Sequence, residues 1–135
     1  DGNVRHPTIH RFFKTEPEPG LLDILTGKLP WEKALRKSDR VNFYVLPSGS
    51  PAASPLFWLG SERMAELLAL LKSEFEFVVI DAPPLLESAE TELFLPWMEA
   101  SVLVIKARRT GRETARRAVT RLQGYKNFLG AVLNR

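Results

Sequence analysis

The sequence has 135 residues, of which 44% are hydrophobic and 26% charged, so it predicts a folded chain with a sizeable core rather than a disordered one. The net charge of +3 does not by itself indicate a nucleic-acid partner, and the lack of Cys excludes disulfides and thiolate chemistry. No apolar run approaches the ~20 residues of a membrane span. The chain begins with Asp rather than Met, and we expect it to be a piece of a longer protein.

The first part of the chain predicts three short helices and one strand. The helices are expected at 8–13, 20–26 and 30–36, each with an apolar side and with a Gly or Pro near one end. The strand is expected at 41–46, where the sequence VNFYVL is rich in β-formers. A loop rich in Pro, Ser and Gly follows it.

Two longer helices are expected in the rest of the chain. Ser61 is a good N-cap for the first, whose apolar residues recur at helical spacing: Met64, Leu67, Leu68 and Leu71. Thr110 and Glu113 have the spacing of a capping box at the start of the second. A shorter helix is expected at 92–98.

Three further strands are expected at 76–81, 101–106 and 128–134. The first contains the unbroken run FVVI, which suits a strand buried on both faces of a parallel sheet. Strands that alternate with helices at this spacing predict an α/β fold with three αβα layers and a mostly parallel sheet. We expect one domain over 1–135.

Asp81 directly follows the strand at 76–81, and two prolines end the strand there. The carboxyl end of a parallel strand is where open α/β sheets bind ligands. In P-loop nucleotide hydrolases an Asp at this position holds Mg²⁺, directly or through water. The alternative is an Asp that only caps the strand end, and the strand by itself does not decide between the two.

A phosphate-binding loop of the form G-x-x-x-x-G-K-[ST] is absent from the sequence. The nearest approach, Gly20 with Gly27 and Lys28, has the wrong spacing, and Leu29 stands where Ser or Thr is required. Without such a loop the chain alone has weak means to hold ATP.

Other polar residues have both a functional and a plainer interpretation. Asp1, Asn3 and Arg5 would point the same way on an extended segment beside Asp81, although a frayed terminal loop is the simpler explanation. Asn134 could read an adenine edge with its amide, or could simply end the last strand.

The last predicted helix and its approach are strongly basic. They could face an acidic partner or a membrane surface, but a solvated helix face is favoured for these residues: Arg108, Arg109, Arg112, Arg116, Arg117 and Arg121. His6 and His10 have one-turn spacing but no further ligand to complete a metal set, so zinc is not expected.

Taken in order, several segments carry a family pattern. The sequence DGNVRHP at 1–7 matches D-x-D-x-R-x-P apart from Asn3, and further segments follow: GLLDILTG at 20–27, LPSG at 46–49, DAPP at 81–84 and GAVLNR at 130–135. With these segments the chain resembles the cytoplasmic ATPase domain of bacterial tyrosine autokinases that control capsular and exopolysaccharide export. These kinases are P-loop ATPases of the deviant-Walker type.

The resemblance implies a P-loop NTPase-like fold whose first strand, phosphate loop and next helix would precede Asp1. It implies ATP and Mg²⁺ as cofactors of the intact domain. Asp81 and Asp1 would position Mg²⁺, directly or indirectly, and Asp1 would also orient the metal or the attacking hydroxyl. Arg5 would support the phosphates, and Asn3 and Asn134 would belong to the nucleotide site, where Asn134 reads adenine.

Asn3 departs from the family pattern, which has an acid there that helps with Mg²⁺ and acts as a base. An amide cannot accept a proton at neutral pH, so the resemblance leaves open whether the protein is an active enzyme. The Tyr-rich tail that the family autophosphorylates is also absent, and only Tyr44 and Tyr125 are present.

Three hypotheses follow. The first is an ATP-dependent protein-tyrosine autokinase-like domain that regulates polysaccharide chain length and export. It would work in the cytoplasm at the inner face of the cell membrane, with a transmembrane polysaccharide co-polymerase (a chain-length determinant protein) as partner and with no nucleic acid. The second is a degenerate relative that binds a partner of the export machinery without catalysis, which Asn3, Glu90 and the missing phosphate loop favour. The third is a partition or septum-site ATPase, which the GL…G and VLPSG segments disfavour.

We also expect self-association through an exposed sheet edge, unless the chain belongs to a longer polypeptide.

Overall fold

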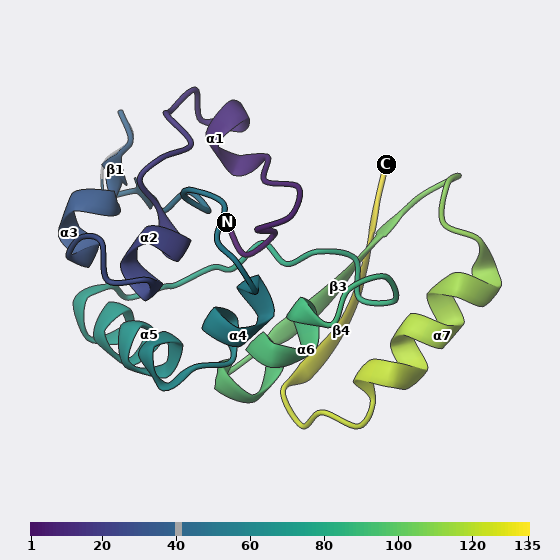
Figure 1. Cartoon of the computed structure of the whole chain (residues 1–135). Helices are drawn as coiled ribbons and strands as arrows, with labels where there is room; N and C mark the ends of the chain where they lie inside the picture. The colour runs from purple at the N-terminus through teal and green to yellow at the C-terminus, as the bar shows by residue number, and fades with distance from the viewer. Residues whose placement is uncertain (40–41) are drawn as a thin grey trace. The chain divides into compact units, whose positions relative to one another are not determined.

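The computed structural model describes residues 1–39 and 42–135. The chain divides into two compact units, Asp1–Leu93 and Phe94–Arg135, each of which is described by itself (Figure 1). The single domain expected over 1–135 stays a prediction. In the part of the chain that the structure describes, no helix has the length and apolar character needed to cross a membrane.

The first unit is mostly helical. Its elements, in chain order, are α1 (Ile9–Phe12), α2 (Leu21–Leu25), α3 (Trp31–Ala34), β1 (Arg36–Lys37), β2 (Tyr44–Val45), α4 (Pro55–Leu59), α5 (Glu62–Glu74) and α6 (Glu90–Phe94), at whose end the second unit begins. The three early helices confirm the predicted ones with fewer residues each. Helix α4 was not predicted: the expected loop ends at Pro55, and no element was assigned to 56–60.

The core of the first unit forms where α2 packs against α3 and α4, and α4 against α5 (Figure 1). The predicted apolar stripe of α5 is buried in full, together with leucines of α2 and α4; the buried residues are Met64, Leu67, Leu68, Leu71, Leu21, Leu22, Leu25 and Leu59. Ser61 does precede α5 but does not cap it with its side chain. Its hydroxyl donates to the Trp58 carbonyl at 2.7 Å instead.

The strand expected at 41–46 is much shorter in the structure, and Val41 lies outside the described residues. Only β2 forms there, and it pairs antiparallel with β1, with Tyr44 opposite Lys37. The composition, rich in β-formers, correctly predicted a strand in this segment. The partner is a neighbouring two-residue strand rather than a strand of a parallel sheet, so the prediction of a parallel neighbour at 41–46 was wrong.

The strand expected at 76–81 is extended but is not a strand in the structure. Val78 and Ile80 are half-buried, whereas the side chains of Phe77 and Val79 are 81% and 90% exposed. The prediction of burial on both faces was therefore wrong. An apolar run gives a preference for extended backbone, but a strand exists only where neighbouring backbone supplies the ladder of hydrogen bonds.

The second unit is a β-α-β arrangement preceded by a 3₁₀ turn. Its elements are η1 (Leu95–Trp97), β3 (Ser101–Lys106), α7 (Arg112–Leu122) and β4 (Phe128–Asn134). The two strands are parallel and in the predicted places, with Leu103 opposite Ala131 in the register. The helix expected at 92–98 is divided between α6 and η1.

Helix α7 packs against both strands of the second unit through Ala118 and Leu122 (Figure 1). The capping box expected from Thr110 and Glu113 does not form. The N-cap is Gly111, which places Glu113 at the second helical position, and a capping box needs the acid at the third.

Replacing Val79 with Lys tests whether the exposed face at 76–81 mediates association. We expect the chain to self-associate through this segment, because extended backbone with apolar side chains pairs readily with another chain. Val79→Lys should weaken the association constant roughly tenfold, the value of burying one Val side chain. Light scattering over a concentration series measures this.

Ala69→Lys, at an exposed position of α5, adds the same charge elsewhere and is the matched control. A chain that is monomeric at every concentration, or equal behaviour of the two variants, would contradict the prediction.

Candidate active site

The first two residues of the chain lie beside Asp81. The Asp1 nitrogen donates to the Leu46 carbonyl at 2.8 Å, and the Gly2 N–H donates to the Asp81 carbonyl at 2.8 Å. Successive nitrogens thus bond to two different extended segments, as they do in a strand with a neighbour on each side. The structure therefore brings the motif at 1–7 next to Asp81, as the sequence predicted.

The Asp1 carboxylate organises the loop that follows it. Its Oδ2 accepts hydrogen bonds from the Thr8 and Ile9 N–H groups, both at 3.0 Å, and its Oδ1 accepts one from the Asn3 N–H at 3.2 Å. It therefore holds the start of α1. Two carboxylate oxygens offer about four lone-pair sites, so this role leaves room for a cation ligand.

Asn3 and Arg5 do not share the direction of Asp1. The chain turns at Val4 and Arg5 instead of continuing in the extended form that the prediction required. The Asn3 Oδ1 accepts a hydrogen bond from the His6 N–H at 3.2 Å, which closes this turn. The expectation of three aligned polar side chains was wrong, because the carboxylate and amide side chains bond to nearby backbone N–H groups and stabilise a turn.

Arg5 pairs with Glu90, at the start of α6. The Arg5 Nε donates to Glu90 Oε1 in an ion pair, and the Ser88 hydroxyl donates to Glu90 Oε2. The Glu90 side chain is 3% exposed and that of Arg5 is 56% exposed. Burial raises the pKa of the Glu90 carboxyl, but the hydrogen bonds from Ser88 and Arg5 outweigh burial and hold it below its usual value.

Asp81 itself is exposed, at the end of its extended segment. Among the described residues, no group of three or more His, Cys, Asp or Glu side chains is placed to hold a metal by itself. Mg²⁺ bound with a nucleotide needs only one or two protein carboxylates, since phosphates and water complete its shell. The roles of Asp81 and Asp1 in holding it stay predictions.

Asn134 ends β4, in the second unit, where its side chain is exposed. Its backbone carbonyl accepts a hydrogen bond from the Ala107 N–H at 2.7 Å. Its place at the carboxyl end of a parallel strand was predicted correctly. A shared edge with Asp81 and the contact with adenine stay predictions.

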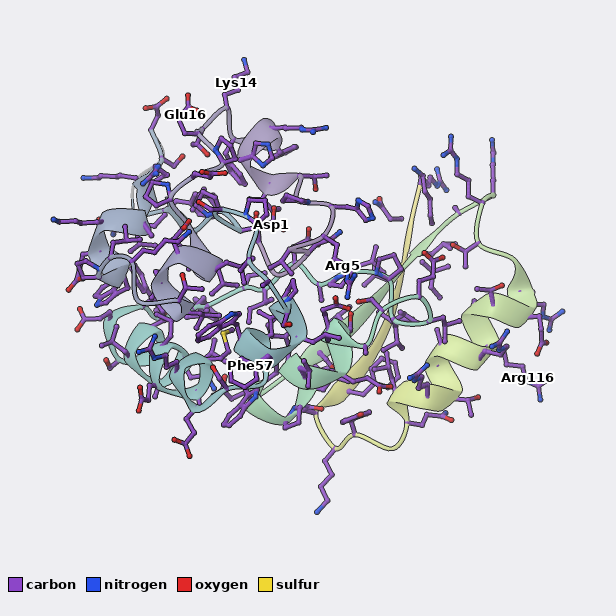
Figure 2. All side chains as sticks on the ribbon, in the orientation of Figure 1. Asp1, Arg5, Lys14, Glu16, Phe57 and Arg116 are labelled. Carbon is purple, nitrogen blue, oxygen red and sulfur yellow. The ribbon has the colours of Figure 1, made fainter. Side chains whose placement is uncertain are left out.

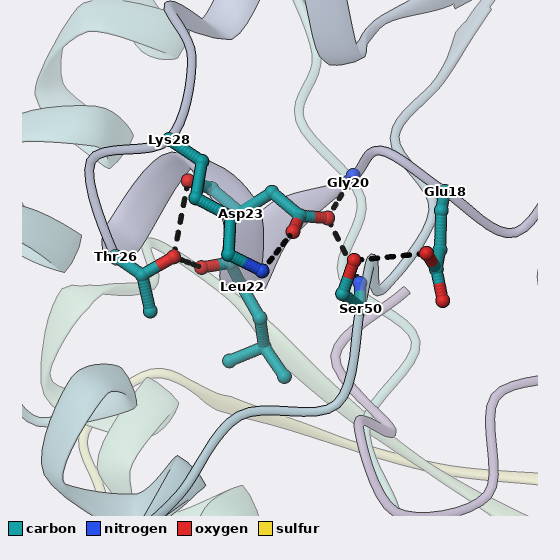
Figure 3. Close-up of polar contacts among 7 residues, drawn as sticks. All are labelled: Glu18, Gly20, Leu22, Asp23, Thr26, Lys28 and Ser50. Carbon is teal, nitrogen blue, oxygen red and sulfur yellow. Dashed lines mark hydrogen bonds and ion pairs between the residues drawn. The ribbon is translucent and has the colours of Figure 1, made fainter.

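Asp23 is the buried carboxylate that the sequence did not single out. It is 2% exposed, and its Oδ2 accepts from the N–H groups of Gly20 at 3.0 Å and Ser50 at 2.8 Å (Figure 3). Lys28, considered above only as a phosphate-loop residue, bonds to Asp23 Oδ1 at 2.8 Å. The Ser50 hydroxyl in turn donates to Glu18 Oε2 at 2.9 Å. We call this set of contacts the Asp23 clasp.

An open pocket of about 520 Å³ adjoins the Asp23 clasp. Thr26 and Lys28 line one part of it, and Phe57 and Trp58 of α4 another. The two aromatic rings meet edge to face with centroids 5.2 Å apart, and Phe57 projects from the helix with 67% of its surface exposed (Figure 2). The lining is mostly apolar and holds no carboxylate, so it offers no magnesium site.

No family model matches the sequence. The chain is 33% identical over 135 residues to the tyrosine-protein kinase YwqD of Bacillus subtilis, covering 99% of the chain and 57% of that protein. It is 28% identical to the putative tyrosine-protein kinase CapB of Staphylococcus aureus, covering all of the chain and 60% of CapB. The crystal structure of the VpsO kinase domain superposes with a TM-score of 0.93 at 30% identity, covering all of the chain and 68% of that domain.

This chain belongs to the bacterial tyrosine-protein kinases. The kinase domain of Escherichia coli ETK also matches, with a TM-score of 0.92 at 26% identity, covering 99% of the chain and 53% of ETK's domain. These neighbours confirm the predicted P-loop kinase-type α/β fold. The family assignment also replaces the alternative of a partition or septum-site ATPase. The chain thus spans somewhat under two thirds of the length of YwqD and of CapB.

Two contacts of this chain were missed from the sequence. Glu90 was considered only as a residue that favours a degenerate relative, and its partner Arg5 is 85 positions away. For Asp23 a local signal exists, because it is an acid at the third position of a helix that begins after Gly20. Such an acid reaches back to the N-cap N–H, as in a capping box.

Asp23→Asn should lower the free energy of unfolding by about 2 kcal/mol at neutral pH. Burial raises the pKa of Asp23, but its bonds with Lys28, Ser50 and Gly20 outweigh burial and bring it from 3.8 to about 2. Since the folded pKa is depressed, the stabilisation is complete above pH ~4 and is lost as pH falls toward 2. Urea unfolding at several pH values measures both effects.

Asp39→Asn, at an exposed position of the same unit, removes an equal charge and is the control. If Asp23→Asn were no less stable than this control, or if the two variants lost stability equally between pH 4 and 2, the role of the clasp would be refuted.

Arg5→Met should destabilise the chain by about 2 kcal/mol, because it leaves the buried Glu90 carboxylate without its cation. The folded pKa of Glu90 is depressed in the wild type, so its pairing stabilises the fold above the ordinary carboxyl pKa and is lost below it. The stability difference between wild type and variant should therefore be largest at neutral pH and shrink in acid. Denaturant titrations at pH 7 and pH 3 test this.

Arg11→Met, which removes an exposed cation nearby in sequence, should have little effect. A pH-independent loss in Arg5→Met would show that Arg5 contributes through packing rather than through Glu90.

Proposed function

We propose that this chain is the larger part of an ATP-dependent protein-tyrosine autokinase domain that regulates the chain length and export of exopolysaccharide or capsule. The observation that carries the proposal is the hydrogen bond from Gly2 to Asp81, which joins the motif at 1–7 to the segment expected to hold Mg²⁺. Family membership supports the reaction class.

Bound Mg²⁺ and ATP would supply the phosphoryl group and neutralise its charge. In our proposal Asp81 holds Mg²⁺, directly or through water, and Asp1 provides a second carboxylate beside it. Arg5, kept in place by Glu90, contributes positive charge to the phosphates. Asn134 reads the adenine edge. Phosphoryl transfer depends on such positioning and charge stabilisation more than on covalent chemistry of the protein.

We also propose a location in the cytoplasm at the inner face of the cell membrane, with a transmembrane polysaccharide co-polymerase as partner. The solved structure of the chimerical protein CapA2B2, which superposes with a TM-score of 0.95 at 26% identity and of which the chain covers 60%, supports a two-component arrangement. A relative that is 26% identical, a putative tyrosine-protein kinase in the cps region of Klebsiella pneumoniae, supports a partner of the same kind. Self-association belongs to this proposal as well.

Asn3 favours a second candidate, a non-catalytic relative that binds a partner of the export machinery. Its amide stands at the position of an acid in the family pattern, and its oxygen accepts a hydrogen bond from the His6 N–H. An amide there cannot take the proton of an attacking tyrosine hydroxyl.

A chimera separates the two candidates. The chain alone should transfer no phosphate, because it lacks an amide cradle and Lys for the phosphates. Fused behind the phosphate-loop segment of Bacillus subtilis YwqD, it should phosphorylate a Glu-Tyr copolymer. Asp81→Asn in the chimera should reduce this rate about a hundredfold or more, because the carboxylate that positions the metal is lost.

Asp39→Asn is again the matched control and should leave the rate unchanged. A chimera that is inactive but gains activity with Asn3→Asp would establish the non-catalytic candidate. Activity that is insensitive to Asp81→Asn, or turnover by the chain alone that Asp81→Asn abolishes, would contradict the assigned site.

A further inference from the structure

The exposed side of helix α7 is predominantly basic, with Glu113 as the single acid of the helix. Ala118 and Leu122 pack inward, and Figure 2 shows Arg116 on the side of the helix that faces away from β3 and β4. At about 100° per residue, Arg112, Arg116 and Arg117 fall within roughly 140° of arc opposite the buried pair. The α7 basic surface consists of five exposed arginines of the helix and of the turn before it: Arg108, Arg109, Arg112, Arg116 and Arg117.

This arrangement works against the stability of the helix itself. Arg112 and Arg116 are like charges at i and i+4, which repel each other on a helix surface. Arg108, Arg109 and Arg112 lie at the N-terminal end of α7, where the helix dipole disfavours cations. Glu113, the only acid of α7, stands four residues before Arg117 and can offset that one cation, but it leaves the repulsion between Arg112 and Arg116 in place. Helix stability therefore does not explain why these residues are arginines.

Helix α5 shows what an ordinary solvated face looks like in the same chain. Its exposed charges alternate in sign: Glu62, Arg63, Glu66, Lys72 and Glu74. The contrast extends to the units. Phe94–Arg135 has nine Lys and Arg against two Glu, a formal charge of +7, whereas Asp1–Leu93 has ten against fourteen acids, a formal charge of −4. The modest net charge of the sequence conceals this segregation.

We propose that the α7 basic surface binds the anionic lipid headgroups of the inner face of the cell membrane. A negatively charged leaflet attracts clustered arginines over a distance of about one Debye length without requiring a shaped pocket. The α7 basic surface lies on the outer side of a helix, which suits contact with an extended flat surface. The proposal depends on the proposed function only for placing the chain at that membrane.

The residues between the arginines favour lipid headgroups over other anions. The exposed uncharged residues of the helix and its end are Thr114, Thr120 and Gln123. They are neither the aromatic side chains on which nucleic-acid bases stack nor the large apolar side chains that insert among acyl chains. The contact is therefore electrostatic adsorption, and it should weaken as salt is added.

Vesicle co-sedimentation of the 135-residue chain tests the proposal. The probes are vesicles of neutral phosphatidylcholine and vesicles in which part of it is replaced by phosphatidylglycerol. We expect binding to the second kind only, with loss of binding as salt rises from about 0.05 M to about 0.5 M. The triple variant Arg112→Gln, Arg116→Gln, Arg117→Gln should bind about a hundredfold more weakly, since each cation near an anionic surface is worth about a factor of five.

Two matched variants make the result specific. Arg11→Gln, Lys14→Gln, Lys33→Gln removes three exposed cations of the first unit and should bind nearly as well as wild type. The triple Arg→Lys variant at 112, 116 and 117 keeps the charge and should also bind, because a headgroup layer does not require the planar fork of Arg. Circular dichroism melting should show all three variants folded, since the replaced side chains are exposed.

Equal binding to neutral vesicles, or unchanged binding of the triple Gln variant, would overturn the proposal. Loss of binding in the Lys variant would also overturn it and would indicate a shaped site for an acidic peptide. Duplex DNA added to the vesicles is the competitor for this comparison. If DNA displaces the chain when the concentration of DNA phosphate is below that of anionic lipid, nucleic acid is the preferred partner and the proposal fails. Because the assay needs no phosphoryl transfer, an inactive chimera would leave its outcome unaffected.

Discussion

One buried carboxylate holds two distant stretches of the first unit together. Asp23 bonds to Gly20 on its own helix and to Ser50 in the loop after β2, while Lys28 balances its charge (Figure 3). The backbones then approach so closely that a Cβ at Gly20 would collide with Pro47 and one at Gly49 with Asp23, and Gly49 has a φ of +83° as well. A charge without its partners could not remain in this position.

The packing of α2 depends on that clasp. The Leu21 and Leu22 N–H groups donate to the carbonyls of Pro47 and Ser48 at 2.8 and 2.9 Å, which satisfies the first amides of the helix. With the helix start fixed there, its leucines turn into the core beside α4 and α5. The two segments joined in this way are the GLLDILTG and LPSG motifs of the family pattern. The two motifs therefore contact each other directly in the fold.

In the candidate active site, too, charged side chains hold segments of the fold in place. The Asp1 carboxylate bonds to N–H groups at the start of α1, and Glu90, the first residue of α6, binds Arg5. Each pairing stabilises the local fold, and the backbone bond from Gly2 keeps the start of the chain, with Asp1, beside Asp81. The second unit differs, because the exposed arginines Arg112, Arg116 and Arg117 of α7 outnumber Glu113, the single acid of that helix. Charge in the first unit fixes structure, whereas the α7 basic surface is the part of the second unit for which we propose an external partner.

The sequence by itself determined the apolar stripe of α5, the strands β3 and β4, and the position of Asp81 after an extended apolar run. These features depend on residue periodicity and on local backbone preference, which neighbours in the sequence largely set. Its motifs also sufficed to place the chain in the right family. The tertiary structure alone decided that 76–81 exposes Phe77 and Val79, that Arg5 turns to Glu90, and that Asp23 joins α2 to the loop at 47–50. A strand requires hydrogen-bonding neighbours and a buried charge requires a counter-charge, and in this protein those partners come from segments far away in the sequence.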